Sequence, residues 1–265
     1  MATKQPVPAG KGNLPAKAHD YSNYEGQGFE GQTRDDLSIP FINILQPLSP
    51  QLENIPNAKP GQLFNTVTLE LYPKGVLFVP AATQHVYVEW VPRDQGGGMV
   101  GIHAVNSDVV QAAKRDGEFG RYKTAAGNDL TETFYMPGVV CDEAGNPVTM
   151  AMLAFTSTKI KVYKQINTRL NTFMLERPGG KGKVRPPLFA HLLRITGSAL
   201  IKGSKGSYYN LAITSAGASL AESLLAPTDA RFLAAKECQE LFAQGVLQGN
   251  YGDAAQEEDA GEGNY

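Results

Sequence analysis

The stretch STKIKVYKQINTRLNTFM, residues 157–174, holds a long helical pattern between two groups of strand-like segments. Ser157 or Thr158 is a suitable N-cap, and Pro178 follows a few residues after the pattern ends. We therefore expect one amphipathic helix whose lysines point to solvent. Its apolar residues recur at spacings of three and four, on one helix face: Ile160, Tyr163, Ile166, Leu170, Phe173 and Met174.

Strand-like segments lie on both sides of this helix. Before it, residues 62–71, 75–80 and 84–91 have alternating or β-branched patterns, and residues 132–141 and 147–155 read as a hairpin around the turn 142–146. After it, residues 188–201 and 207–214 predict a second hairpin across residues 203–206. Antiparallel strands, one helix and a further hairpin occur in this order in Greek-key barrels of the oligonucleotide-binding (OB) type. The predicted fold is mainly β (α+β): an OB-like Greek-key barrel with one inserted helix.

The remaining segments set the domain boundaries of the 265-residue chain. Residues 1–36 are rich in Gly and Pro, which predicts a disordered N-terminal segment. Residues 39–50 are apolar but interrupted by prolines, residues 106–129 form a polar insertion with at most one short helix, and two helices are expected over 219–225 and from Thr228 or Asp229 to Phe242. We predict one OB-like domain over residues 37–244, followed by an acidic disordered tail over 245–265.

Composition points to a cytoplasmic protein without a membrane anchor. No segment approaches the ~20 apolar residues that a membrane span needs, and the N-terminus lacks the apolar core of a signal peptide. Cys141 and Cys238 lie far apart and form no metal-binding or disulfide pattern, which is typical of a reducing compartment.

Charge is divided unevenly along the chain. Residues 156–205 contain eleven basic residues and one acid, Glu176, whereas the whole protein has a formal net charge of −2. The basic segment 177–187 is rich in Gly and Pro and has neither a helical nor a strand period. Such a loop can follow a phosphate backbone, and the alternative is a mobile loop that only improves solubility.

Aromatic residues accompany this basic segment. Single-stranded nucleic acid is held by cationic contacts to phosphate together with stacking of bases on aromatic rings. Tyr208 and Tyr209 are adjacent, so in a strand their rings point to opposite faces. The predicted DNA-binding residues are Lys159, Lys161, Lys164, Arg169, Arg177, Lys181, Lys183 and Arg185 for phosphate, with Trp90, Tyr208 and Tyr209 for stacking.

The C-terminal tail carries five acids, no base and a terminal aromatic residue. The chain here resembles the phage single-stranded DNA-binding proteins, in which an OB barrel is followed by an acidic tail with a terminal aromatic. The resemblance covers the strand-helix-hairpin core and the tail. It implies a protein of phage DNA replication or recombination that coats single strands with little base preference and recruits replication proteins, such as a polymerase or helicase-primase. The tail residues implied in partner binding are Asp253, Glu257, Glu258, Asp259, Glu262 and Tyr265.

Catalytic signatures are weak in this sequence. It has no G-x-x-x-x-G-K-[ST], G-x-S-x-G or H-E-x-x-H motif, and its four histidines are scattered. We expect no enzyme activity, no metal and no cofactor. One alternative is a virion-associated or structural β protein whose basic loop contacts the genome or a neighbouring subunit; another is a nuclease or other hydrolase with acids assembled by the fold. Homo-oligomerisation is left open.

Overall fold

The computed structural model describes residues 22–24, 27–31, 39–115, 121–203 and 206–245. The chain divides into two units, Met1–Asp36 and Leu37–Tyr265. In the first unit the described residues include one short 3-10 helix, η1 (Ser22–Tyr24). The predicted disorder of residues 1–36 falls largely, and that of the tail residues 246–265 entirely, outside the described residues.

The second unit is built mainly from strands. Its helical elements are α1 (Gln51–Asn54), η3 (Arg93–Gln95), α2 (Asp108–Ala112), α3 (Lys159–Thr172), η4 (Leu188–Ala190) and α4 (Ala230–Ala243). Its strands are β1 (Ile42–Ile44), β2 (Leu63–Asn65), β3 (Leu71–Tyr72), β4 (Val76–Pro80), β5 (Gln84–Trp90), β6 (Met99–Ala104), β7 (Lys114–Arg115), β8 (Arg121–Lys123), β9 (Asp129–Cys141), β10 (Pro147–Phe155), β11 (Leu175–Glu176), β12 (Lys183–Val184), β13 (Leu193–Gly197), β14 (Ile201–Gly203), β15 (Gly206–Tyr208) and β16 (Leu211–Ser215).

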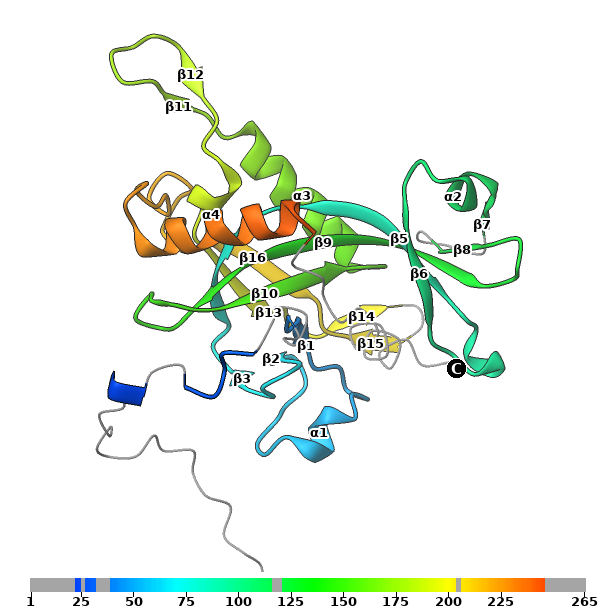
Figure 1. Cartoon of the computed structure of the whole chain (residues 1–265). Coiled ribbons are helices and arrows are strands. Elements are labelled where there is room, and N and C mark those ends of the chain that lie inside the picture. Colours follow the sequence, from blue (N-terminus) through cyan, green and yellow to red (C-terminus); the bar gives the residue numbers. More distant parts are fainter. Residues whose placement is uncertain (1–21, 25–26, 32–38, 116–120, 204–205, 246–265) are drawn as a thin grey trace, which may run out of the picture. The chain divides into compact units, whose positions relative to one another are not determined.

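The long strand β9 organises the main sheet, in which nine of the described strands take part (Figure 1). Along one edge, β9 pairs with β5 over its first half and with β4 over its second half. Along the other edge it pairs with β8 and β10. β13 and β16 extend the sheet beyond β4, and β6 extends it beyond β5. All these pairings are antiparallel.

The described strands do not close into a barrel. The strand path β16-β13-β4-β9-β5-β6 ends in two strands that do not pair with each other within the described residues. The prediction of a mainly β fold with antiparallel sheets is thus confirmed, whereas the OB-like Greek-key barrel is wrong. β9 divides the sheet into two wings, because its first half pairs with β5 and β8 and its second half with β4 and β10. The second wing is covered by α3 on one face and α4 on the other, so neither face is the interior of a barrel.

Two helices cover opposite faces of the wing formed by β4, β9, β10, β13 and β16. Side chains alternate along a strand, so that Phe78 joins a cluster under α3 and Val79 joins one under α4. The α3 cluster includes Ile160, Tyr163, Ile166 and Leu170, four residues of the apolar helix face predicted from spacing.

Several predicted elements are confirmed. The hairpin around residues 142–146 forms as β9 and β10, with Phe155 opposite Phe134 at its far end. Residues 188–214 form an interrupted hairpin, with ladders β13–β16 and β14–β15. Asp229 caps α4 by accepting a hydrogen bond from the Arg231 backbone N–H at 2.9 Å.

Three local predictions differ from the structure. The basic segment after α3 forms a two-strand hairpin, β11–β12, and not an irregular loop. Residues 219–225 form turns and a bridge instead of a helix. Phe173 and Met174 lie beyond the end of α3, because the backbone becomes extended at Phe173 (φ −74°, ψ 125°) and leads directly into β11.

Candidate nucleic-acid interface

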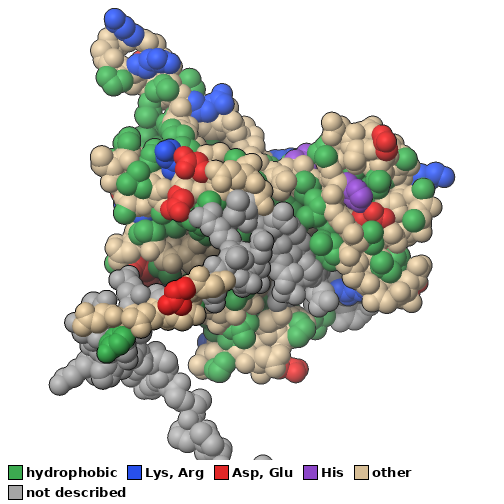
Figure 2. Space-filling model, viewed as in Figure 1, with side chains coloured by type: hydrophobic (Ala, Val, Ile, Leu, Met, Phe, Trp, Pro, Cys, Tyr) green, Lys and Arg blue, Asp and Glu red, His purple; other side chains and the backbone are tan. Residues whose placement is uncertain are grey.

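The β11–β12 hairpin projects from the second unit and carries exposed cations at its tip (Figures 1 and 2). Its ladder is short, with Leu175 opposite Val184 and Glu176 opposite Lys183. The connecting turn is closed by hydrogen bonds from Arg177 N–H to Gly182 C=O at 2.8 Å and from Gly180 N–H to Arg177 C=O at 3.0 Å. An open recess of about 480 Å³ beside the turn is lined by Arg177, Pro178, Lys181 and Val184.

One acid lies within this cationic hairpin. Glu176 Oε1 is 3.8 Å from Lys183 Nζ, and both side chains are largely exposed. Exposed ion pairs are screened by water and salt, so the hairpin keeps a strongly positive surface.

Helix α3 leads into the hairpin and presents four further cations. Lys161, Lys164 and Arg169 are exposed, and Lys159 is half-buried at the first position of the helix. At 100° per residue, Arg169 lies about 140° around the helix from Lys164. The α3 cations are therefore spread over the whole solvent face, and the edge marked by Lys164 is the one nearest to β9.

Aromatic rings continue the surface on this edge. Lys164 Nζ lies 5.5 Å from the centre of the Phe134 ring, a distance typical of a cation–π contact. Phe134 stacks on Tyr163 on one side, at 4.5 Å between ring centres, and on His85 on the other, at 4.1 Å. The His85 side chain is 35% exposed, so this row of rings reaches solvent at His85.

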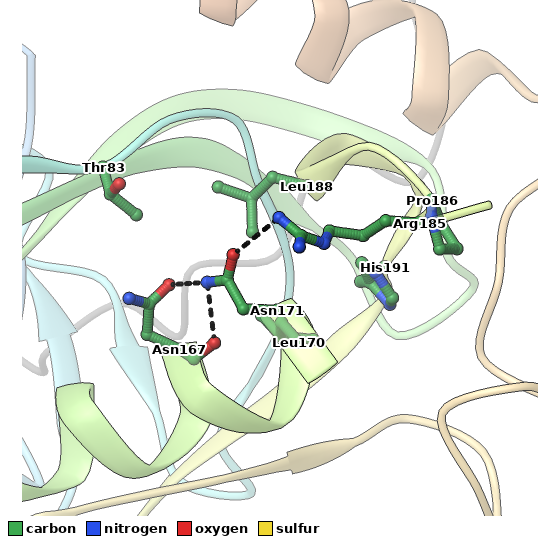
Figure 3. Close-up of a pocket in the computed structure, with 8 residues that line it drawn as sticks. All are labelled: Thr83, Asn167, Leu170, Asn171, Arg185, Pro186, Leu188 and His191. Atoms are coloured by element: carbon green, nitrogen blue, oxygen red, sulfur yellow. Dashed lines mark hydrogen bonds between the residues drawn. The ribbon is translucent and has the colours of Figure 1, made fainter. Parts of the chain in front are cut away.

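A cavity of about 190 Å³ lies where α3, the end of the hairpin and η4 meet (Figure 3). Its polar lining residues are Thr83, Asn167, Asn171, Arg185 and His191. Thr83 is two residues before His85, so the cavity and the aromatic row are neighbours along the chain. Burial lowers the pKa of the His191 imidazole, which is 1% exposed, so the ring stays neutral near pH 7.

Carboxylates mark the limit of the cationic surface on the side of β5 and β6. Glu132 Oε1 lies 3.0 Å from His85 Nε2, and the Glu89 carboxylate lies 2.7 Å from both His103 Nε2 and Asn128 Nδ2. Burial opposes the ionisation of Glu89, but hydrogen bonds from Asn128, His103 and Thr124 outweigh it and lower the pKa of the carboxyl. These anions repel phosphate, so the cationic surface ends near His85.

The three predicted stacking residues lie elsewhere. Trp90 has the same side-chain parity on β5 as Val86 and Val88 and packs against their apolar cluster, on the face opposite His85. Tyr209 is half-buried, and its backbone N–H and C=O bond to the Gln46 side chain at 2.9 Å. Tyr208 lies in the β14–β15 hairpin, which is well separated from the projecting β11–β12 hairpin (Figure 1). The cations of α3 and of the hairpin therefore adjoin along the chain, and these three rings do not lie beside them.

Sequence reasoning missed the part of the surface formed by His85, Phe134 and the cavity. The alternation of side chains along β5 indicates the face on which His85 lies, because it sets His85 and Tyr87 on one face of the strand and Val86 and Val88 on the other. The contact between His85 and Phe134 has no local signal, since it depends on the register of two strands that are about fifty residues apart in the chain.

The predicted partner-binding residues lie outside the described residues. They are Asp253, Glu257, Glu258, Asp259, Glu262 and Tyr265. Across the described residues, no three His, Cys, Asp or Glu side chains are placed to hold a metal ion. No helix there is both long and apolar enough to cross a membrane.

The comparison with known families identifies the class of protein. The model of the Pam3 phage gp34-like protein family matches residues 9–248 of the chain, which include the mainly β unit with its two covering helices and cationic hairpin. The chain belongs to this family and is a phage protein. No curated protein and no solved structure matches it significantly.

Proposed function

We propose that this phage protein binds single-stranded DNA with little base preference and acts in replication or recombination without a catalytic step of its own. The observation that supports the proposal is the concentration of cations on α3 and the β11–β12 hairpin, with eight basic residues and one acid over residues 159–185. A flexible single strand can follow such a surface, because its phosphates are spaced along a bendable backbone.

The aromatic row gives the surface a means to hold bases. His85 reaches solvent at the end of a stack that begins in the core with Tyr163 and Phe134, so its ring is held in place before any strand binds. A fixed ring beside cations provides base stacking worth about 1–3 kcal/mol per base, independent of sequence. We propose His85 as the stacking residue beside these cations. Trp90, Tyr208 and Tyr209, the candidates from the sequence, lie apart from them.

The acidic tail is assigned to partner recruitment in the same proposal. Its five acids and Tyr265 have the composition of a segment that docks into basic pockets of other proteins. Replication proteins such as a polymerase or helicase-primase are the proposed partners.

Equilibrium binding of fluorescein-labelled oligonucleotides tests the proposal. Fluorescence anisotropy is recorded for single-stranded DNA, single-stranded RNA and duplex DNA at several salt concentrations. We expect saturable binding that is tighter for the single strand than for the duplex. If about five cations contact phosphate, the slope of log affinity against log salt is about −3.5. Equal affinity for duplex DNA, or a slope near zero, would contradict the proposal.

The alternative, a virion-associated or structural β protein, is favoured by one feature of the sheet. In the described part of the chain β6 pairs with β5 alone, and its residues Met99 and Val100 are 40% and 51% exposed. An unpaired strand edge with exposed apolar residues is suited to assembly. Light scattering coupled to size-exclusion chromatography separates the two functions, since the alternative predicts stable assembly without DNA.

A further inference from the structure

The cavity between α3 and η4 has an ordered set of hydrogen-bonding groups (Figure 3). Arg185 Nη1 donates to Asn171 Oδ1 at 3.3 Å. Asn171 Nδ2 in turn donates to Asn167 Oδ1 at 2.9 Å, and to the Asn167 backbone C=O at 2.9 Å. The three side chains form one chain of hydrogen bonds from the hairpin end of the cavity to its α3 wall.

The direction of this chain is fixed by Arg185. A guanidinium has only donors, so the amide oxygen of Asn171 must face it and the Asn171 nitrogen must face Asn167. Asn167 then uses its oxygen as the acceptor. Both side-chain oxygens are occupied, whereas the Asn167 Nδ2 group makes no hydrogen bond to the residues that the structure describes and stays available as a donor.

The charge of the lining residues and the volume of the cavity limit the kind of ligand that can bind. Arg185 is the one ionised group among the residues that line this cavity, since no carboxylate is present and His191 is neutral. A guanidinium and one free amide donor in the lining of the same cavity suit a ligand rich in acceptors, with negative charge. The volume of about 190 Å³ is below the ~300 Å³ at which drug-sized ligand sites begin, and holds the volume of about six waters. A group the size of phosphate fits within this volume.

We propose that this cavity is a phosphate site, in which Arg185 and the Asn167 amide bind one phosphate group of the strand. The source of the phosphate rests on the single-strand binding proposed above, whereas the site itself does not. Asn171 is a positioning residue here, because it orients the Asn167 amide and holds Arg185 at the mouth.

The matched variants are Asn167→Asp and Gln244→Glu. Both replace an amide by a carboxylate. The exposed Gln244 directly follows α4, which covers the sheet face opposite α3, and it is not among the residues that line the cavity. Asn167→Asp turns the free donor into an anion inside the cavity. Asn167→Ser removes the donor without adding charge, and so distinguishes loss of the site from simple charge repulsion.

The first measurement uses inorganic phosphate as the probe and follows the Asn167 side-chain amide by NMR. At constant ionic strength we expect a saturable shift of this resonance with phosphate and none with chloride, and the same shift in Gln244→Glu. Affinity for a single-stranded thymidine oligonucleotide should fall about tenfold in Asn167→Asp, severalfold in Asn167→Ser and less than twofold in Gln244→Glu.

The outcomes separate the two proposals. Absence of a phosphate-dependent shift at Asn167, or equal losses in Asn167→Asp and Gln244→Glu, overturns the phosphate site. A phosphate-dependent shift in a protein that does not bind the oligonucleotide overturns single-strand binding and the strand as the source, and leaves a site for free phosphate.

Discussion

Gly138 allows the two wings of the sheet to meet. It lies in β9 opposite Pro80, where the neighbouring chain passes from β4 to β5. A Cβ atom here would lie 2.4 Å from the Phe78 ring and 2.4 Å from the Val79 carbonyl oxygen. Neither can move aside, because Phe78 and Val79 are 0% exposed and belong to the two clusters on either side of the sheet.

Gly138→Ala should therefore destabilise the protein strongly. We expect a loss of about 3 kcal/mol in the free energy of unfolding, at the upper end for an overpacked core. Urea denaturation followed by circular dichroism measures it. Gly101→Ala is the matched control in strand β6, where the nearest atom to the added Cβ is 3.9 Å away, and it should stay within about 0.5 kcal/mol of the parent. If Gly138→Ala and Gly101→Ala unfold at similar urea concentrations, the β4–β9 contact relaxes to accommodate the added Cβ atom at position 138.

His191 should make stability depend on pH. Burial lowers the pKa of its imidazole in the folded protein, so the unfolded chain binds this proton more readily. Its contribution is fully present above the unfolded pKa, about 6.5, and is lost as pH falls below that value towards the folded pKa. The loss is at most about 1.4 kcal/mol per pH unit.

His191→Gln should flatten this dependence. Urea midpoints at several pH values between 5 and 7 compare the slopes, and a general loss of stability in the variant does not affect the comparison. Arg185 lines the same cavity and is present in both proteins. If the urea midpoint depends equally on pH in the parent and in His191→Gln, groups other than His191 cause the pH dependence of stability.

For single residues, the sequence reveals the type of each side chain and the face of its helix or strand on which it lies. It does not reveal how closely residues distant in the chain approach one another. It predicted that Ile160, Tyr163, Ile166 and Leu170 face the core, because helical spacing is local. Leu233 on α4 is apolar as well, yet it is 52% exposed. The need for glycine at position 138 arises from Phe78, sixty residues away, and has no local signal.

Among the elements, the β11–β12 hairpin gives the sharpest test of DNA binding. The double variant Lys181→Gln/Lys183→Gln removes two exposed cations without touching the apolar core. If both contact phosphate, the slope of log affinity against log salt should become less negative by about 1.4, at about 0.7 per contact. Anisotropy titrations over a range of salt concentrations measure the change.

Lys236→Gln is the control for this element. Lys236 lies on α4, where its Nζ is 3.2 Å from Glu240 Oε1, and α4 covers the sheet face opposite α3. Its removal should leave the slope unchanged. If the hairpin variant keeps the parental slope, the hairpin is a solubilising projection and α3 alone remains a candidate for phosphate contact.

The elements that could be predicted share a local cause. The β9–β10 hairpin and α4 are encoded by a turn sequence and an N-cap next to periodic apolar residues. The β11–β12 hairpin has two residue pairs, too few for any strand pattern. The absence of a closed barrel follows from the division of the β9 edge between β4 and β5, a choice between distant partners that strand patterns do not determine.

Over the whole molecule, positive charge is concentrated in residues 159–185 and negative charge in the last twenty residues of the chain. An anionic segment tethered to a protein with a cationic surface competes with DNA at a high effective concentration, although each contact is weak. Competition of this kind raises the apparent Kd of the strand without altering the surface itself. It also releases the segment for partner proteins when DNA is bound.

Truncation after Val246 should therefore tighten single-strand binding severalfold at low salt and abolish capture of a replication partner. At 1 M salt the Debye length falls to about 3 Å, and the two chains should bind alike. Replacement of the five acids by their amides should reproduce the effect of truncation on DNA affinity, whereas Tyr265→Ala should not, since the competition depends on charge. Equal affinity of the full and truncated chains at low salt would show that the tail does not reach the cationic surface, and partner capture would then have to be regulated without DNA.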